Sequence, residues 1–132
     1  MSSDHQNRRL WQRLQAAADE EVEALVRRMP AELRDKARTI AVTYEPVVSQ
    51  AMLDDDQLEP DLLGLFVGDC YAEVEAGVTD LPPQILLFLM SLWDYADHLD
   101  GDFREQVRRT YLHELGHYLG LDEGDLEARD LD

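Results

Sequence analysis

The chain has 132 residues, of which 45% are hydrophobic, and its 29 Asp and Glu against 12 Lys and Arg give a formal net charge of −17. This length predicts one domain over residues 1–132, and the ordinary hydrophobic fraction indicates a folded globular protein in spite of the acidity. The charge argues against nucleic acid and anionic membranes as partners, because both are bound through a surplus of Lys and Arg.

Targeting signals and cysteine content both bear on the compartment of the protein. The N-terminus lacks the apolar stretch of a signal peptide, and the longest apolar run, which starts at Ile85, is far shorter than the roughly 20 residues that span a bilayer. Cys70 is the single cysteine, which excludes an intrachain disulfide and fits a reducing compartment. We therefore expect a cytoplasmic protein in which Cys70 is a small buried hydrophobe.

The N-terminal part predicts two helices. Residues 1–6 are polar and predict a flexible tail. Apolar residues then recur at three- and four-residue spacing from Leu10 to Met29, which indicates an amphipathic helix that ends before a proline. Pro30–Ala37 predicts a short second helix with the proline at its first position.

Three segments in the middle of the chain predict strands. Ile40–Tyr44 alternates in the two-residue period of a half-buried strand. Asp54–Asp56 indicates a solvated turn or the start of a helix, and metal binding there is disfavoured because the spaced carboxylates of a calcium loop are absent. Leu62–Val67, interrupted by Gly64, predicts a second strand. Ile85–Leu89 is apolar on both faces, which predicts a central or covered third strand.

Two helices are expected after this strand, a short one over residues 92–99 and a long, well-defined one. The pair Asp102 and Glu105 has the spacing of a capping box that starts the long helix, and Gly120 stands where a left-handed residue would end it. Seven apolar residues fill one broad arc of its helical wheel: Phe103, Val107, Tyr111, Leu112, Leu115, Tyr118 and Leu119.

The long helix carries the sequence His-Glu-Leu-Gly-His-Tyr-Leu-Gly-Leu-Asp-Glu. His113 and His117 are one helical turn apart, just off the apolar arc, so both can direct a ring nitrogen at a metal ion about 2 Å away. Glu114 is rotated about 100° from His113, which points it away from the position of a third ligand. It can instead reach a water held on the metal and act as a general base.

A third ligand is expected just after this helix. A tight turn at Gly120 lets the chain fold back, so that a residue three positions later, Glu123, completes the coordination, with Asp122 as the alternative. Two histidines and one carboxylate leave a position open for water, as a catalytic zinc site requires. The full pattern arises by chance in about one chain in ten thousand of this composition, so a plain surface helix is a poor explanation.

The segment from His113 to Glu123 resembles the extended zincin motif. The chain as a whole resembles the small bacterial minimal-zincin family of predicted zinc metallopeptidases. This resemblance covers most of residues 30–130 and rests further on the segments Leu62–Gly68 and Leu81–Ile85. It implies an α+β fold in which a small mixed β-sheet packs on the zinc-binding helix, here with helices added at the N-terminus.

The resemblance also implies a function and a site. It makes the protein a zinc-dependent metallopeptidase with His113, His117 and Glu123 as zinc ligands and Glu114 as the catalytic base. The third ligand is His in the metzincins and often Asp in the minimal family, so Asp122 stays an alternative to Glu123. A carboxylate ligand lowers the charge of the centre, so its water is acidified less and Glu114 must do more of the proton transfer.

Two other functions are alternatives to the peptidase. Bacterial rRNA-maturation endoribonucleases also place metal ligands at i, i+4 and i+10, but with Gly after the first His and His as the third ligand, where this chain has Glu114 and Glu123. The net charge of −17 further opposes RNA binding. The other alternative is a zinc-binding interaction protein without catalytic activity, which an open coordination position disfavours.

Four further side chains are candidates for the site. Tyr118 could donate to an oxyanion, but its place in the apolar arc favours core packing. Tyr95 and His98 could line a cleft, although a surface role is the simpler expectation for both. Arg109 could orient a carboxylate, but an i,i+4 pair with Glu105 is favoured.

The negative charge is concentrated in one segment. Residues 39–103 hold 14 Asp and Glu and no Lys or Arg, and they contain all the predicted strands. A solvated acidic surface that keeps the protein soluble is the simplest explanation. Because the substrate of a zincin lies against an edge strand of the sheet, we also expect a peptide or protein substrate of basic character.

Overall fold

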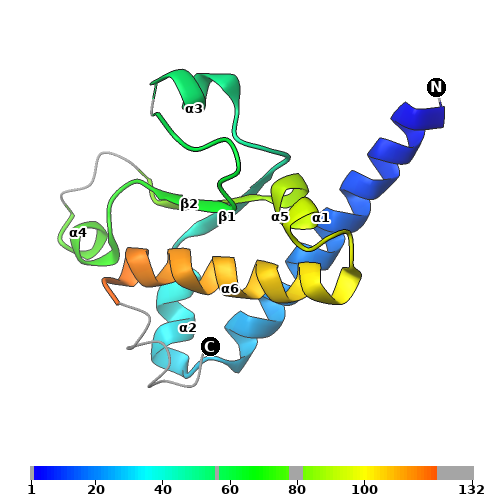
Figure 1. Cartoon of the computed structure of the whole chain (residues 1–132). Helices are drawn as coiled ribbons and strands as arrows, with labels where there is room; N and C mark the ends of the chain where they lie inside the picture. The colour runs from blue at the N-terminus through cyan, green and yellow to red at the C-terminus, as the bar shows by residue number, and fades with distance from the viewer. Residues whose placement is uncertain (1, 56, 78–81, 122–132) are drawn as a thin grey trace.

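The computed structural model describes residues 2–55, 57–77 and 82–121, and Figure 1 shows their arrangement. In chain order the elements are α1 (Ser2–Arg28), α2 (Ala31–Ala37), β1 (Ala41–Glu45), α3 (Gln50–Asp55), β2 (Gly64–Val67), α4 (Tyr71–Glu75), β3 (Gln84–Phe88), α5 (Leu89–Tyr95) and α6 (Asp100–Leu119). One small sheet among these helices confirms the expected α+β class. No helix in the described part is long and apolar enough to cross a membrane.

The sheet is mixed, with β3 in its centre. Its strand order is β1-β3-β2, and β1 runs parallel and β2 antiparallel to β3. Successive side chains of β3 point to opposite faces. Ile85 and Leu87 belong to the main core with α1 and α6, whereas Leu86 and Phe88 form a second, smaller cluster with Val48. The prediction of a central strand covered on both faces is therefore confirmed.

Helix α1 buries the apolar stripe that its sequence predicts. Leu14 and Ala18 are almost inaccessible, and the helix ends before Pro30. This proline is the N-cap of α2 and not its first residue. The helix already starts at Ser2, so it includes residues 2–6, where the sequence predicted a tail. Its outer end projects beyond the body of the molecule (Figure 1).

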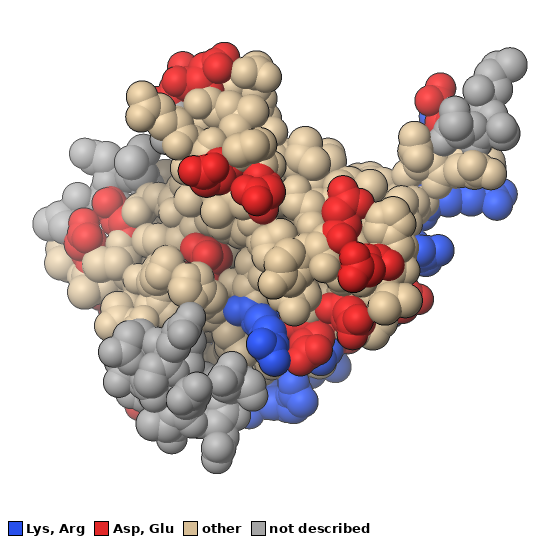
Figure 2. Space-filling model, in the orientation of Figure 1, with Lys and Arg blue, Asp and Glu red and all other residues tan. Residues whose placement is uncertain are grey.

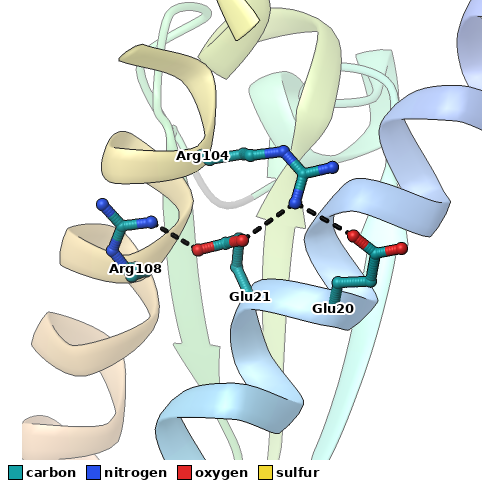
Figure 3. Close-up of polar contacts among 4 residues, drawn as sticks. All are labelled: Glu20, Glu21, Arg104 and Arg108. Carbon is teal, nitrogen blue, oxygen red and sulfur yellow. Dashed lines mark hydrogen bonds and ion pairs between the residues drawn. The ribbon is translucent and has the colours of Figure 1, made fainter. Parts of the chain in front are cut away.

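Helix α6 lies across the sheet and packs against β2, β3, α5 and α1. A group of charged side chains joins it to α1 (Figure 3). Arg104 donates to Glu20 at 3.0 Å and to one oxygen of Glu21 at 2.9 Å. Arg108 donates to the other oxygen of Glu21. These contacts and the apolar core between the helices set the position of α6 relative to α1.

The start of α6 differs from the prediction. The expected capping box of Asp102 and Glu105 is wrong, because α6 begins before Asp102, after the N-cap Leu99, and no side chain caps it. The Phe103 N–H donates to the Leu99 carbonyl at 2.8 Å, so Asp102 already lies inside the first turn. Phe103 is fully buried with its ring edge-on to Trp93, and this tertiary contact sets where the chain enters the helix.

Helix α5 lies earlier in the chain than the predicted helix over residues 92–99. Asp97 and His98 adopt left-handed backbone angles, with φ of 54° and 62°. A right-handed helix cannot continue through such residues, so α5 ends before them. The chain then turns directly into α6.

The structure also differs from the expectations for Cys70 and for the aspartates at positions 54 and 55. Cys70 is only half-buried, and its thiol donates to Glu73 at 3.1 Å, so it is not the buried hydrophobe that we expected. Asp54 and Asp55 are exposed and close α3, so they do not start a helix. Asp56 lies outside the described residues.

Candidate metal centre

The amphipathic character of α6 places the two histidines of the motif. Six residues of the predicted apolar arc are buried: Phe103, Val107, Tyr111, Leu112, Leu115 and Tyr118. Because this side of the helix is held in the core, His113 and His117 are kept on its exposed side. The expectation that the histidines lie outside the core is confirmed.

Helix α6 ends at Leu119, two residues after the second histidine, and the predicted end at Gly120 is confirmed. Gly120 has a left-handed backbone with φ of 73° and ends α6. The Leu121 N–H donates to the Gly116 carbonyl at 2.7 Å, and the Gly120 N–H donates to the His117 carbonyl at 3.2 Å. This pair of bonds is a Schellman motif, which turns the chain sharply at the helix end.

The histidines and the glutamate between them form one compact group. The ring centroids of His113 and His117 are 4.6 Å apart. Ligand atoms of His113, Glu114 and His117 all lie within 4.8 Å of one another, and this is the one such group that the described residues form. Two nitrogens that each lie about 2 Å from a zinc ion are separated by less than 4 Å, so small side-chain rotations bring the pair to ligand distance.

Glu114 has an unusual environment for a carboxylate. It is only 7% exposed and is the one charged residue buried within the described ranges. Its Oε1 atom lies 3.4 Å from Nδ1 of His117. The carboxylate is thus held at the edge of the histidine pair, within reach of a water or an ion bound there.

A glycine on the sheet makes room for Glu114. A Cβ atom on Gly64, the first residue of β2, would lie 3.4 Å from Cγ of Glu114 and 2.5 Å from Cγ2 of Thr110. The bare backbone of Gly64 therefore lets β2 approach α6. Sequence reasoning took Gly64 only as an interruption of a strand and missed Thr110. The available signal was a glycine within an apolar strand, which often marks a close approach of two backbones.

A cleft of about 920 Å³ opens in front of this group. Its floor is α6, from Arg109 to Glu114, and its walls are the segment 59–64 that leads into β2, residues of α5, and Val47. Tyr95 lines the cleft and is 63% exposed. The catalytic candidate Glu114 therefore faces a concave surface large enough for a segment of polypeptide.

Tyr118, Arg109 and His98 make structural contacts. Tyr118 is fully buried, and its hydroxyl is hydrogen-bonded with that of Thr39, which confirms core packing. Arg109 donates to Glu105 at 3.1 Å, which confirms the expected i,i+4 pair. His98 is hydrogen-bonded to Asp94 at 2.8 Å and stacks on Trp93, and is not among the residues that line the cleft.

The donor set fits a zinc ion. Two imidazole nitrogens on one face of a helix are ligands that zinc prefers, and both histidines are open to solvent on that face. The expected third ligand, Glu123, and its alternative, Asp122, both lie outside the described residues. Within the described residues the site consists of His113, Glu114 and His117.

A sequence profile described as zincin-like metallopeptidase matches residues 37–132, which include the whole motif and exclude nearly all of α1 and α2. The chain belongs to the zincin-like metallopeptidase family. Membership in this family of zincins and the His-Glu-His group together imply a metal, with zinc as the expected ion. No curated protein matches the chain.

Proposed function

We propose that this member of the zincin-like metallopeptidase family hydrolyses peptide bonds in the cleft in front of α6. The observation that carries the proposal is the burial of Glu114 beside His113 and His117. A buried carboxylate is costly unless the site uses or compensates it, so a carboxylate buried at the wall of a cleft marks a candidate functional site. Family membership supports hydrolysis as the reaction class.

In this proposal His113 and His117 hold the metal, with Glu123 as the third ligand and Asp122 as the alternative. A bound zinc ion would supply an acidified water and polarise the carbonyl of the scissile bond. Glu114 is the general base: it accepts the proton of the attacking water and afterwards delivers a proton to the departing amine. Its burial favours this role, because a carboxylate shielded from bulk water interacts more strongly with charge that develops beside it.

The edge of the sheet offers a place for the substrate backbone. Within the described residues β2 pairs with β3 only, and residues 62–64 at its start line the cleft. An extended peptide can add to such an edge through main-chain hydrogen bonds. We therefore infer a peptide or protein substrate. The net charge of −17 supports this over nucleic acid, and the single cysteine supports action in the cytoplasm.

The test is the Glu114→Gln variant, loaded with zinc and assayed on a library of peptides. We expect the variant to bind one zinc ion per chain, as the wild type does, and to lose hydrolysis by at least a hundredfold, in line with the usual size of general-base catalysis. Asp102→Asn, which changes an exposed carboxylate in the first turn of the same helix and outside the cleft, is the matched control and should keep full activity. Wild-type turnover by Glu114→Gln would falsify the assignment. A zinc-loaded wild type that cleaves no peptide would instead favour a zinc-binding interaction protein.

A further inference from the structure

The cleft in front of Glu114 is predominantly acidic. Apart from the histidine of the metal group, the charged residues that line it are four carboxylates and one guanidinium, that of Arg109. Arg109 donates to Glu105 on its own helix, so its charge is partly offset. In the orientation of Figure 1, acidic side chains gather above α6 and at its right-hand end, whereas most basic side chains lie along α1 and below α6 (Figure 2).

Two of the four carboxylates are available to a ligand. Glu114 is the proposed base, and Asp94 is already bonded to His98. Glu59 and Asp61 are exposed, and neither carboxylate has a hydrogen-bond or ion-pair partner within the described ranges. Both stand on the wall that leads into the edge strand β2, where a peptide backbone would run.

Exposed apolar side chains share the same cleft. The large hydrophobic residues exposed in the described part of the chain are Val47, Tyr95 and Leu99, and the first two line the cleft at 49% and 63% exposure. Exposed apolar groups that gather in a concave site indicate contact with a ligand. The face of the Tyr95 ring suits the alkyl stem of Lys or the planar head of Arg, both of which pack on aromatic rings.

We propose that the cleft selects substrates that present a Lys or Arg side chain to Glu59 and Asp61, with Tyr95 and Val47 packing on its apolar stem. The proposal rests on the proposed peptidase function for the use of the cleft and adds the residues that determine its specificity. The size of the effect is bounded, because each exposed ion pair contributes a factor of roughly two to five. We expect about a fivefold to tenfold preference at low ionic strength, which salt should reduce.

The test measures binding separately from cleavage. Three fluorescent nonapeptides differ only in their central residue, which is Lys, norleucine or Glu, and are titrated onto the zinc-loaded Glu114→Gln protein at low salt. We expect the Lys peptide to bind about fivefold more tightly than the norleucine peptide and the Glu peptide to bind most weakly. Adding Glu59→Gln and Asp61→Asn should abolish the difference between Lys and norleucine and leave norleucine binding unchanged, which also shows that the cleft is intact.

A matched control removes two carboxylates outside the cleft, with Asp4→Asn and Asp35→Asn in the same background. The overall charge changes by the same amount as in the Glu59→Gln, Asp61→Asn variant, but the cleft keeps its carboxylates, so this control should keep the Lys preference. Equal binding of the Lys and norleucine peptides to the parent protein, or a Lys preference that persists without Glu59 and Asp61, would overturn the proposal. A Lys preference that depends on these residues, together with a zinc-loaded wild-type protein that cleaves none of the three peptides, would support the proposal and contradict only the peptidase function.

Discussion

Gly64 of β2 lies so close to Thr110 of α6 that a Cβ atom on the glycine would be 2.5 Å from the Thr110 Cγ2 atom. The two residues are far apart in the sequence, and their contact brings the sheet edge and the proposed catalytic helix together. Thr110 cannot easily rotate away, because the side chain of a β-branched residue in a helix has few allowed rotamers. The close approach of β2 to Glu114 therefore depends on the absence of a side chain at Gly64.

Replacing Gly64 with Ala should separate the strand from the helix. We expect Gly64→Ala to lower the free energy of unfolding by about 1–3 kcal/mol, the usual cost of overpacking, as measured by urea denaturation. The double variant Gly64→Ala, Thr110→Ser removes the Cγ2 atom that clashes and should recover most of the loss. A double variant that is no more stable than Gly64→Ala would show that this contact does not limit the packing.

The contacts of Glu21 with α6 should make stability depend on pH. Burial raises the pKa of Glu21, but the hydrogen bonds and positive charges of Arg108 and Arg104 outweigh it and hold the pKa below its ordinary value of 4.5. A carboxyl whose pKa is lowered by folding stabilises the folded state above its ordinary pKa, and this stabilisation is lost as the pH falls through the lowered value.

The Glu21→Gln variant tests this dependence. At pH 7 its free energy of unfolding should be about 1 kcal/mol lower than that of the wild type, because it loses charge-assisted hydrogen bonds. This difference in stability should shrink once the pH is below 4.5. Thermal unfolding between pH 7 and pH 3 measures both. Glu20→Gln is the control, since Glu20 is 67% exposed and bonds to Arg104 alone, so its effect should be smaller. A difference between Glu21→Gln and wild type that is constant over this range would contradict the linkage.

The turn at Gly120 should matter for zinc. Gly120→Ala forces a side chain into the left-handed region at φ of 73°, which costs about 1–2 kcal/mol. Because the turn must form for the following carboxylate to reach the site, we expect zinc binding to weaken about fivefold to tenfold in competition with a chromophoric chelator. Gly77→Ala, at φ of 72° and equally open, is the matched control: it should cost similar stability and leave zinc affinity unchanged. Equal zinc affinities for the two variants would argue against a ligand beyond Gly120.

The third ligand can be assigned by substitution. Loss of an outer-shell partner weakens metal binding about tenfold to a hundredfold, so loss of a direct ligand should weaken it by about a hundredfold or more. We expect Glu123→Gln to have this effect and Asp122→Asn to change zinc affinity by less than about threefold. The reverse result would assign Asp122, and two variants with wild-type affinity would place the third ligand elsewhere.

The sequence by itself determined the parts of this protein that depend on short-range geometry. The four-residue spacing of His113 and His117 places them on one helix face wherever the helix packs. Gly120 ends the helix because a left-handed residue is accessible to glycine at little cost. The apolar run of β3 predicts a central strand, since both faces must be covered. Each of these conclusions needs only the residues within one element.

The tertiary structure alone decided which distant residues share the site. The approach of Gly64 to α6, the burial of Glu114 beneath it, and the position of Glu59 and Asp61 on the cleft wall join segments that no local pattern connects. The position at which α6 begins also depends on tertiary structure, because the packing of Phe103 on Trp93 sets it and the nearby carboxylates do not. Local spacing sets the direction of a side chain within a turn or a strand, whereas packing of the core sets what that side chain meets.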